Sequence, residues 1–461
     1  MAQERMPPDF PPLRVVLSGS GEAGSQYELG LMYARGQGAP RDRTEAARWF
    51  RASADRGDAR AQYCLACMYS VGQGVPQDTA AALAWYRKAA DQGYARAQYA
   101  LARVYRRGEG VPEDHSVAAT WYRKAALQGY IRAQNDLGVM YENGQGVAED
   151  HVEAVAWYRR AAEQGDALAQ NNLGFMYERG RGVPQDFAMA VQWYRRAATQ
   201  GNAEAQFNLG VMHDRGQGVR QDCNEALRWF RKSADRGFAS AQNNLGYLYE
   251  RGRGVPQDYA EASKWYLKAA EQDCAQAQNN LGVLHESGQG VAQDYAEARR
   301  WFLKAAEHGF AVAQYNLGVM CEIGLGAPQD YSESRKWFHA AADQGNASAQ
   351  FSLGVLYEKG YGVQQDYAEA LEWYRKSAEQ GDPAAQLNLG VMYYHGRGVP
   401  QDYIEAHKWL NVAASRFLPS EAEKRARAIK NRDIVAKKMT QVWMEEAQRL
   451  AREWKPKPTG S

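Results

Sequence analysis

The chain has 461 residues, of which 45% are hydrophobic, and its 56 Lys and Arg residues nearly balance its 54 Asp and Glu residues. This balance supplies no strong attraction to nucleic acid or to an anionic membrane surface, and no stretch reaches the ~20 apolar residues of a membrane-spanning helix. We therefore expect no nucleic acid partner and no membrane insertion.

The first segment, residues 1–20, is polar and rich in proline, which favours an extended or irregular conformation. We expect a flexible leader. The alternative is that Pro8–Leu17 is itself a ligand for the rest of the chain, and a peptide fused through a Gly/Ser linker would have the same composition. The apolar run Val15–Leu17 is too short for a signal peptide. A cytoplasmic location is therefore favoured, while a periplasmic or secreted one stays open if a signal peptide was removed.

Residues 21–416 repeat a 36-residue unit eleven times, most clearly at Ala241–Gln276. A Gln that follows Ala or Ser marks each copy: Gln26, Gln62, Gln98, Gln134, Gln170, Gln206, Gln242, Gln278, Gln314, Gln350 and Gln386. A fixed period of this length is typical of a solenoid, in which each unit packs only on its neighbours.

Each unit predicts two helices joined by a short loop. In the fifth copy, apolar residues from Ala169 to Tyr177 fall at i, i+4, i+7 and i+8, the stripe of an amphipathic helix. The Gly180–Pro184 segment breaks this pattern, and Asp186 is positioned to cap the second helix. The second helix ends at a Gly in nine of the eleven copies. In the seventh copy Asp273 stands there, and Asp tolerates a left-handed conformation less well.

Three further positions recur within the unit. A Glu lies three residues after the capping Asp in eight copies and predicts a reciprocal capping box: Glu45, Glu153, Glu225, Glu261, Glu297, Glu333, Glu369 and Glu405. A Gly follows Leu in most first helices, from Gly138 to Gly390, and allows a neighbouring helix to approach closely. One Trp per copy, from Trp49 to Trp409, is interpreted as core packing, with ligand stacking as the alternative.

The unit resembles the Sel1-like repeat, a relative of the tetratricopeptide repeat, in the pattern A-Q-x-x-L-G-x-x-Y-x-x-G-x-G-V-P-Q-D-x-x-E-A-x-x-W-Y-x-x-A-A. The resemblance covers about Gly21 to Ser415 and rests on eleven consecutive copies. It implies an all-α, right-handed superhelical solenoid of helix-loop-helix repeats. It also implies a scaffold or adaptor that assembles protein complexes.

The repeat pattern ends after Trp409, and residues 417–455 predict two capping helices, the second starting at Thr440. One face of that second helix is expected to carry Trp443, Ala447, Leu450 and Trp454. The last repeat of a solenoid needs such a closing element. Residues 456–461 are expected to form a disordered tail.

A candidate ligand surface lies beside the core stripe of the first helices, which by resemblance line the concave face. One row of this surface is a repeated Asn: Asn172, Asn208, Asn244, Asn280, Asn316 and Asn388. A side-chain amide can pair with both the N–H and the C=O groups of an extended peptide backbone. The alternative is that these amides bond to the neighbouring repeat and position the helices.

Two more rows follow at successive helical turns. The apolar row is Phe175, Val211, Tyr247 and Val283, which predicts pockets for side chains, with partial core burial as the alternative. The basic row is Arg179, Arg215 and Arg251, which suits carboxylates, with a solvated charged face as the alternative. Phe207, Tyr315, Phe351 and Leu387 are expected to flank the Asn row. Together the rows predict a groove, centred on copies five to eight, for a protein or an extended peptide. That peptide is expected to be acidic or the chain's own Pro-rich leader.

No catalytic or metal-binding motif appears. The eight His are scattered without metal-ligand spacing, and the G-x-G-V-P loops join two helices instead of following a strand. The Cys64/Cys67 pair has no second pair nearby, and Ser332 and Lys336 are one residue too far apart for the Ser-x-x-Lys motif. We therefore expect no enzyme and no cofactor. Two alternatives stay open: a purely structural scaffold that uses its convex or terminal surfaces, and a hydrolase of the β-lactamase kind.

Overall fold

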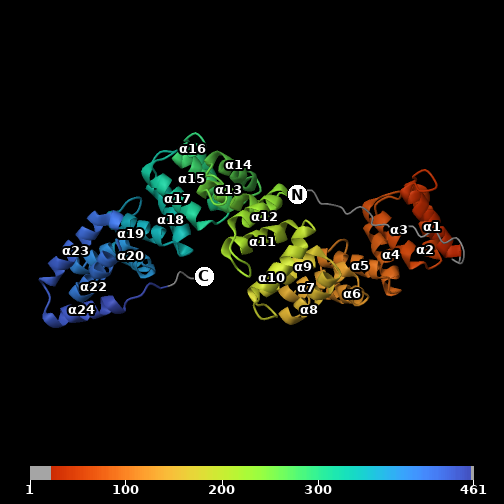
Figure 1. Cartoon of the computed structure of the whole chain (residues 1–461), viewed down its shortest axis with the longest axis horizontal. Coiled ribbons are helices and arrows are strands. Elements are labelled where there is room, and N and C mark those ends of the chain that lie inside the picture. Colours follow the sequence, from red (N-terminus) through yellow and green to blue (C-terminus); the bar gives the residue numbers. More distant parts are fainter. Residues whose placement is uncertain (1–21, 458–461) are drawn as a thin grey trace. The chain divides into compact units, whose positions relative to one another are not determined.

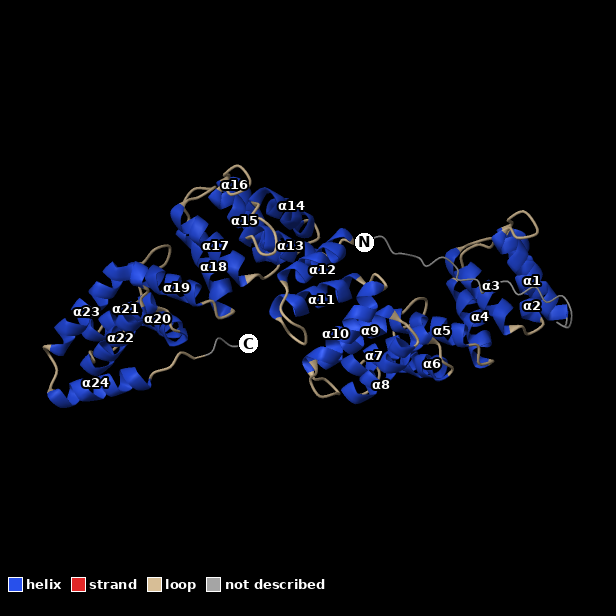
Figure 2. Ribbon diagram, viewed as in Figure 1, coloured by secondary structure: helices blue, strands red, loops and turns tan. Residues whose placement is uncertain are grey.

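The computed structural model describes residues 22–457, so the predicted leader, residues 1–20, and the last part of the predicted tail, residues 458–461, lie outside it. The described residues form 24 α-helices and one short 3₁₀ helix, with no strand among them (Figure 2). The all-α prediction is confirmed.

Each repeat contributes two helices, labelled in Figure 1. The first helices are α1 (Glu22–Arg35), α3 (Ala59–Val71), α5 (Ala95–Arg107), α7 (Ile131–Asn143), α9 (Ala167–Arg179), α11 (Ala203–Arg215), α13 (Ala239–Arg251), α15 (Ala275–Ser287), α17 (Ala311–Ile323), α19 (Ala347–Lys359) and α21 (Pro383–His395). The second helices are α2 (Arg43–Asp55), α4 (Thr79–Asp91), α6 (His115–Leu127), α8 (His151–Glu163), α10 (Phe187–Thr199), α12 (Cys223–Asp235), α14 (Tyr259–Ala270), α16 (Tyr295–Glu307), α18 (Tyr331–Asp343), α20 (Tyr367–Gln380) and α22 (Tyr403–Arg416). The repeats are followed by η1 (Pro419–Glu421), α23 (Ala422–Ala436) and α24 (Gln441–Glu453).

The helices fall into two compact units, Met1–Trp229 and Phe230–Ser461, with the boundary inside α12. In the first unit, successive helices from α1 to α11 pack against one another (Figure 1). In the second unit the same holds from α13 to α22. Each unit is therefore a stack of helix pairs whose core is distributed along the stack, as expected for a solenoid.

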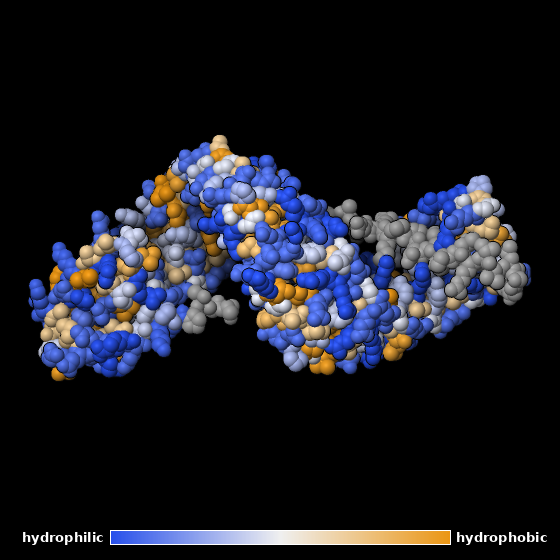
Figure 3. Space-filling model, in the orientation of Figure 1, coloured by the Kyte–Doolittle hydropathy of each residue, from blue (hydrophilic) through white to orange (hydrophobic). Residues whose placement is uncertain are grey.

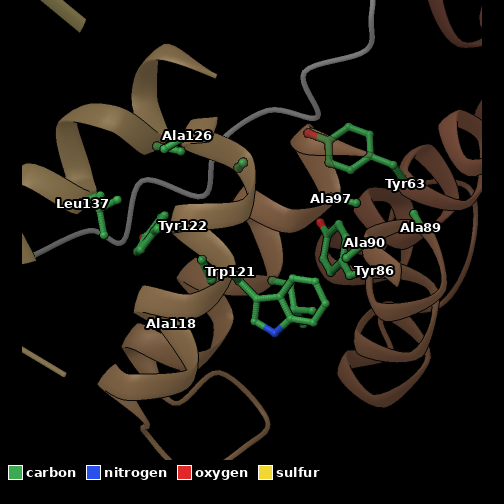
Figure 4. Packing of buried hydrophobic residues seen from close by; sticks show 14 of the residues in the cluster. Tyr63, Tyr86, Ala89, Ala90, Ala97, Ala118, Trp121, Tyr122, Ala126 and Leu137 are labelled. Atoms are coloured by element: carbon green, nitrogen blue, oxygen red, sulfur yellow. The ribbon is translucent and has the colours of Figure 1, made fainter. Parts of the chain in front are cut away.

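A glycine in the first helix makes room for an aromatic ring from the second helix of the same repeat. A Cβ atom on Gly138 would lie 2.7 Å from the ring of Tyr158, and one on Gly174 would lie 2.8 Å from the ring of Tyr194. Both rings are fully buried. Figure 4 shows the interior of the first unit, where rings such as Tyr122 pack among alanine and leucine side chains. The glycine therefore permits the predicted close approach of two helices.

The Trp row packs on the core and is covered on its outer face. Its most buried members are Trp121, Trp157, Trp193, Trp265, Trp301, Trp373 and Trp409. The ammonium nitrogens of Lys124 and Lys268 lie 4.0 Å from the ring centroids of Trp121 and Trp265 on the same helices. This arrangement confirms core packing, because the cation and its aliphatic stem shield the ring from solvent.

The two glycines of the interhelix loop have separate roles. Gly180 has φ +66° and ends α9 in the left-handed conformation. Gly182 has φ +67°, and a Cβ atom there would lie 2.1 Å from the backbone oxygen of His151 in the preceding repeat. The second glycine therefore lets the loop pack against the start of the preceding second helix.

The second helices begin at the predicted Asp caps, but the Glu of the predicted capping box bonds elsewhere. Asp258 accepts a hydrogen bond from the backbone N–H of Glu261 at 2.9 Å. The carboxylate of Glu261 accepts from the indole N–H of Trp265 at 3.0 Å, and Glu405 does the same for Trp409 at 2.9 Å. The Trp one turn along the same helix face offers a donor that replaces the reciprocal half of the capping box.

The Gln that marks each repeat joins it to the preceding one. In the fourth repeat, Gln134 Nε2 donates to the carbonyl oxygen of Ala126 at the end of the preceding second helix, at 3.2 Å. Gln134 Oε1 accepts from Gln164 Nε2 at 2.8 Å within its own repeat. The same pair of bonds occurs at Gln62, Gln98, Gln170, Gln242, Gln314 and Gln350. These buried amides are satisfied only when two repeats are stacked.

The C-terminal helices α23 and α24 both pack on α22. Thr440, the predicted start of the last helix, is the N-cap of α24, which begins one residue later at Gln441. Ala447 is buried, and the ring of Trp454 meets Trp409 at a centroid distance of 5.8 Å. Trp443 is 43% exposed, so the predicted apolar face of α24 is only partly buried. Beyond this helix, the backbone N–H of Lys457 donates to the carbonyl oxygen of Glu379 at 2.8 Å and its ammonium pairs with the carboxylate of Glu379 at 2.7 Å.

Candidate peptide-binding surface

The predicted Asn row lies half-buried on the first helices, and most of it bonds to the preceding repeat. Asn172 Nδ2 donates to Asn135 Oδ1 at 3.1 Å. The same 3.1 Å bond joins Asn208 to Asn171, Asn280 to Asn243 and Asn316 to Asn279. Each of these amides therefore uses one N–H to bond to the neighbouring repeat, as the alternative interpretation expected. An amide used in this way still has an acceptor oxygen and a second N–H.

A second Asn position, one residue earlier, was missed in the sequence analysis. Its members are Asn135, Asn171, Asn243 and Asn279, which accept the bonds just described. The Asn-Asn doublets at 171–172, 243–244 and 279–280 are the sequence feature that reveals it. Adjacent amides at the same position of three repeats could have indicated hydrogen bonds between neighbouring first helices.

The apolar row differs between the two units. In the first unit Phe175 and Val211 are half-buried, so the alternative of partial burial describes them. In the second unit Tyr247 is 41% exposed and Val283 is 40% exposed, on the consecutive first helices α13 and α15. Figure 3 shows that the visible surface is mostly hydrophilic, with scattered hydrophobic patches. Large apolar side chains exposed on neighbouring first helices are a candidate contact surface for a partner.

The basic row lies next to the apolar row. The guanidinium of Arg179 lies 5.6 Å from the ring centroid of Phe175, and that of Arg251 lies 5.6 Å from the ring centroid of Tyr247. Arg215 is exposed at the same position of the next repeat in the first unit. The structure thus brings a predicted aromatic residue and a predicted basic residue together on α9 and again on α13. A planar cation held over a ring keeps outward-facing donors for a carboxylate.

Glutamates one residue before the basic row form a further row that the sequence analysis did not single out. Tyr158, Tyr194, Tyr266 and Tyr374 donate their hydroxyl groups to Glu142, Glu178, Glu250 and Glu358 at 2.6 to 2.8 Å. Burial, together with these carboxylates, raises the pKa of each of the four tyrosines. The row weakens the predicted preference for acidic ligands, because Arg251 Nε also lies 3.3 Å from Glu250.

In two repeats this glutamate lacks its tyrosine. Phe302 and Phe338 stand where the four second helices just described have Tyr, so neither residue offers a hydroxyl group to Glu286 or Glu322. Burial raises the pKa of both carboxyls. Glu286 and Glu322 are thus half-buried carboxyl groups without the tyrosine hydroxyl that donates to the other four glutamates of this row.

A pocket of about 700 Å³ opens in the second unit where the last repeats meet the C-terminal helices. Its walls include Tyr315, Phe351, Asp382, Arg416, Glu421 and Lys424. Two of the predicted flanking residues, Tyr315 and Phe351, therefore line a concave site, whereas Leu387 is buried. The pocket lies outside copies five to eight, where the groove was expected to be centred.

The reactive side chains occupy structural positions. Cys64 is buried, which raises the pKa of its thiol, and burial lowers the pKa of His213 and His407. Within residues 22–457, no three His, Cys, Asp or Glu side chains are arranged as metal ligands. None of the helices described has the combination of length and apolar character that spanning a bilayer requires.

Comparison with known proteins points to one repeat family and to solved structures of the same fold. The family model for the Sel1 repeat matches eleven consecutive segments: residues 23–58, 59–94, 95–130, 131–166, 167–202, 203–238, 239–274, 275–310, 311–346, 347–382 and 383–416. None of the curated proteins matches the chain.

Two crystal structures are similar over most of their length. A protective antigen present in uropathogenic Escherichia coli strains, which displays an SLR fold, is 40% identical with a TM-score of 0.76, covering 94% of this chain and 92% of the antigen. A Sel1 repeat protein from Oxalobacter formigenes is 36% identical with a TM-score of 0.52, covering 67% of this chain and 90% of the other. The eleven matched segments and the shared fold agree with the helix pairs described above. The chain therefore belongs to the Sel1 repeat family.

Proposed function

We propose that this chain is a protein-interaction scaffold that binds an extended segment of a protein partner along its first helices. The observation that carries the proposal is the exposure of Tyr247 and Val283, 41% and 40%, on the neighbouring helices α13 and α15. Other large apolar side chains are exposed too, such as Leu127 at 69% and Val152 at 65%, but Tyr247 and Val283 occupy the same position of consecutive first helices. Exposed apolar patches commonly mark interaction sites. Sel1 repeats, like other helical repeats, generally serve protein–protein interaction, which supports the same function.

The contacts around this surface define what each row contributes to binding. The side chains of Tyr247 and Val283 supply apolar contact, which gives most of the affinity of a peptide groove. In the second unit, Arg251 over the ring of Tyr247 supplies donors for a backbone carbonyl or a carboxylate. Asn280 and Asn316 offer their remaining N–H and oxygen atoms to a peptide backbone, and Asn244, whose oxygen accepts from Asn243 at 3.4 Å, lies in the same row. In the first unit, taken by itself, Arg179 over Phe175 and the amides of Asn172 and Asn208 present the same groups.

Capture of partners from a native cell lysate tests the proposal with a matched control. Tyr247→Ser and Val283→Ser are combined in one variant, and Leu267→Ser, which alters a residue 41% exposed on the second helix α14, is the control. Partners retained by the wild type and the control but lost by the double variant support binding along the first helices. Loss in the control alone would instead support the structural alternative, in which other surfaces hold the partners.

The predicted leader is a second candidate occupant of the same surface. Its residues 1–20 lie outside the described range, so the interaction is a prediction from composition alone. Removing residues 1–20 should increase the number of captured partners if the leader competes with them. Equal capture by the full chain and the shortened chain would contradict this competition.

A further inference from the structure

The pocket between the last repeats and the C-terminal helices has an aromatic side and a charged side. Tyr315 and Phe351 come from the first helices α17 and α19, and Asp382 caps the next first helix, α21. Arg416, Glu421 and Lys424 come from the end of α22 and from the C-terminal segment. Its volume of about 700 Å³ is in the range of small-molecule and side-chain binding sites.

The two cations of the pocket are already engaged. Arg416 Nε donates to the carbonyl oxygen of Gly381 at 3.1 Å, and its guanidinium lies 5.3 Å from the ring centroid of Trp454. Lys424 Nζ pairs with Glu421 at 3.0 Å. These contacts fix the positive charges at the rim and leave them less available to a ligand.

Asp382 is the charge that lacks a counterion. Its carboxylate accepts from the backbone N–H of Ala385 at 2.7 Å, and among residues 22–457 it forms no salt bridge. Burial raises the pKa of this carboxyl, and the negative charge of Glu421 adds to the rise. The backbone hydrogen bonds and the positive charge of Lys424 act in the opposite direction. Burial also raises the pKa of Tyr315, and the charges of Glu322 and Asp382 add to that rise. A positive group entering the pocket would therefore be stabilised by both Asp382 and the adjacent rings.

We propose that this pocket binds a Lys or Arg side chain of a partner protein, with its cationic head at Asp382 and its methylene groups on the rings of Tyr315 and Phe351. The long aliphatic stem of either residue matches an aromatic side wall, and its charged end matches a half-buried carboxylate. This site is distinct from the Tyr247 and Val283 surface, so either can fail without the other.

Asp382→Asn is a suitable test variant because the chain itself caps first helices with Asn. Asn202 and Asn346 accept from the backbone N–H of Ala205 and Ala349 at 2.8 and 2.9 Å, in the same position of other repeats. The variant therefore keeps the cap and removes only the charge. Asp166→Asn is the matched control, since Asp166 caps α9 by the same bond to Ala169 at 2.8 Å and is not part of the pocket.

The probe is a fluorescein-labelled hexa-arginine peptide, measured by fluorescence anisotropy on the full chain, with hexa-glutamate for comparison. We expect hexa-arginine to bind more tightly than hexa-glutamate. Asp382→Asn should weaken hexa-arginine by about tenfold, the size of one lost charge-assisted hydrogen bond. Asp166→Asn should leave the affinity unchanged. Equal affinities of the two Asn variants, or preferential binding of hexa-glutamate, would overturn the proposal.

A third variant, Lys424→Ala, is expected to change the affinity for hexa-arginine in the opposite direction. Lys424→Ala removes the cation that competes for the pocket and frees Glu421 to attract the ligand. It should strengthen hexa-arginine binding. If it weakens binding, Lys424 is part of an anion site and the proposal is wrong. Melting curves and circular dichroism of all three variants verify that each remains folded.

Discussion

At the scale of single residues, the loop glycines combine a backbone requirement with a packing requirement, and the two can be measured separately. Gly182→Ala places a methyl group 2.1 Å from a backbone oxygen at φ +67°. Gly165 has φ +95°, and a Cβ atom there would meet no other atom within 4 Å. Gly165→Ala therefore measures only the free-energy cost of placing alanine in the left-handed backbone conformation. We expect the control to lose about 1 kcal/mol and Gly182→Ala to lose about 3 kcal/mol in denaturant unfolding. Equal losses would contradict the packing role of the second glycine.

Asp273 is the one non-glycine residue with positive φ among the described residues, at +61°. It occupies the position that a glycine fills at the end of other second helices, such as Gly309 one repeat later. Asp273→Gly should therefore raise the unfolding free energy by about 0.5–1 kcal/mol, and Gly309→Asp should lower it by a similar amount. Thermal melting of both variants measures the difference. A stabilising Gly309→Asp would show that the left-handed conformation is not the cost.

The stability cost of Glu286 depends on pH. Burial raises the pKa of this carboxyl, so the folded state binds its proton more tightly than the unfolded state does. The contribution of Glu286 to stability is therefore greatest below its unfolded pKa and is lost as the pH rises through its folded pKa. Glu286→Gln should be more stable than the wild type at pH 7 and equally stable near pH 4. Glu250→Gln is the control, because Glu250 accepts from Tyr266 at 2.7 Å and should not gain stability at pH 7. An advantage of Glu286→Gln that persists unchanged at pH 4 would exclude this explanation.

Sequence reasoning located residues at the correct positions but could not assign their partners. The Asn row was correctly placed on the first helices, yet its bonds to Asn135, Asn171, Asn243 and Asn279 depend on the rotation between successive helices. The pocket at Asp382 was missed because it joins residues from 315 to 424 that no local pattern connects.

At the scale of helices, the Asn pairs are expected to couple neighbouring repeats. Asn280 donates to Asn243 at 3.1 Å between α15 and α13. A double-mutant cycle with Asn243→Ala and Asn280→Ala should give a coupling free energy of about 0.5–1.5 kcal/mol in denaturant unfolding. Additive single effects would mean that the bond contributes nothing to stacking, and the row would then be free for a ligand.

Helix starts and ends were the most predictable feature of the elements. Asp caps and left-handed glycines act through the local backbone, so the sequence alone locates them. The prediction that the repeated glutamates complete capping boxes was wrong in part, because the indole N–H groups of Trp265 and Trp409 donate to Glu261 and Glu405. Exposure of Trp443 on α24 also differs from expectation, since the amphipathic pattern does not reveal how far the helix extends over α22.

For the whole molecule, the fixed period predicted eleven helix pairs and a distributed core, and both are observed. The division into two units inside α12 was not predicted, because residues 203–238 carry the same pattern as the other repeats. The marker Gln, the loop glycine and the Asn pair all act between adjacent repeats. Stability should therefore be a sum of repeat and interface contributions, in contrast to a single globular core.

Hydroxyl-radical footprinting distinguishes a partner bound along the first helices, as proposed, from one bound along the second helices. Tyr247 on α13 and Leu267 on α14 are both 41% exposed in the free chain, so each reports one helix of the same repeat. In complex with a partner captured from lysate, oxidation of Tyr247 should fall severalfold while that of Leu267 stays unchanged. Protection of Leu267 with Tyr247 still fully reactive would contradict the claim and place the partner on the second helices.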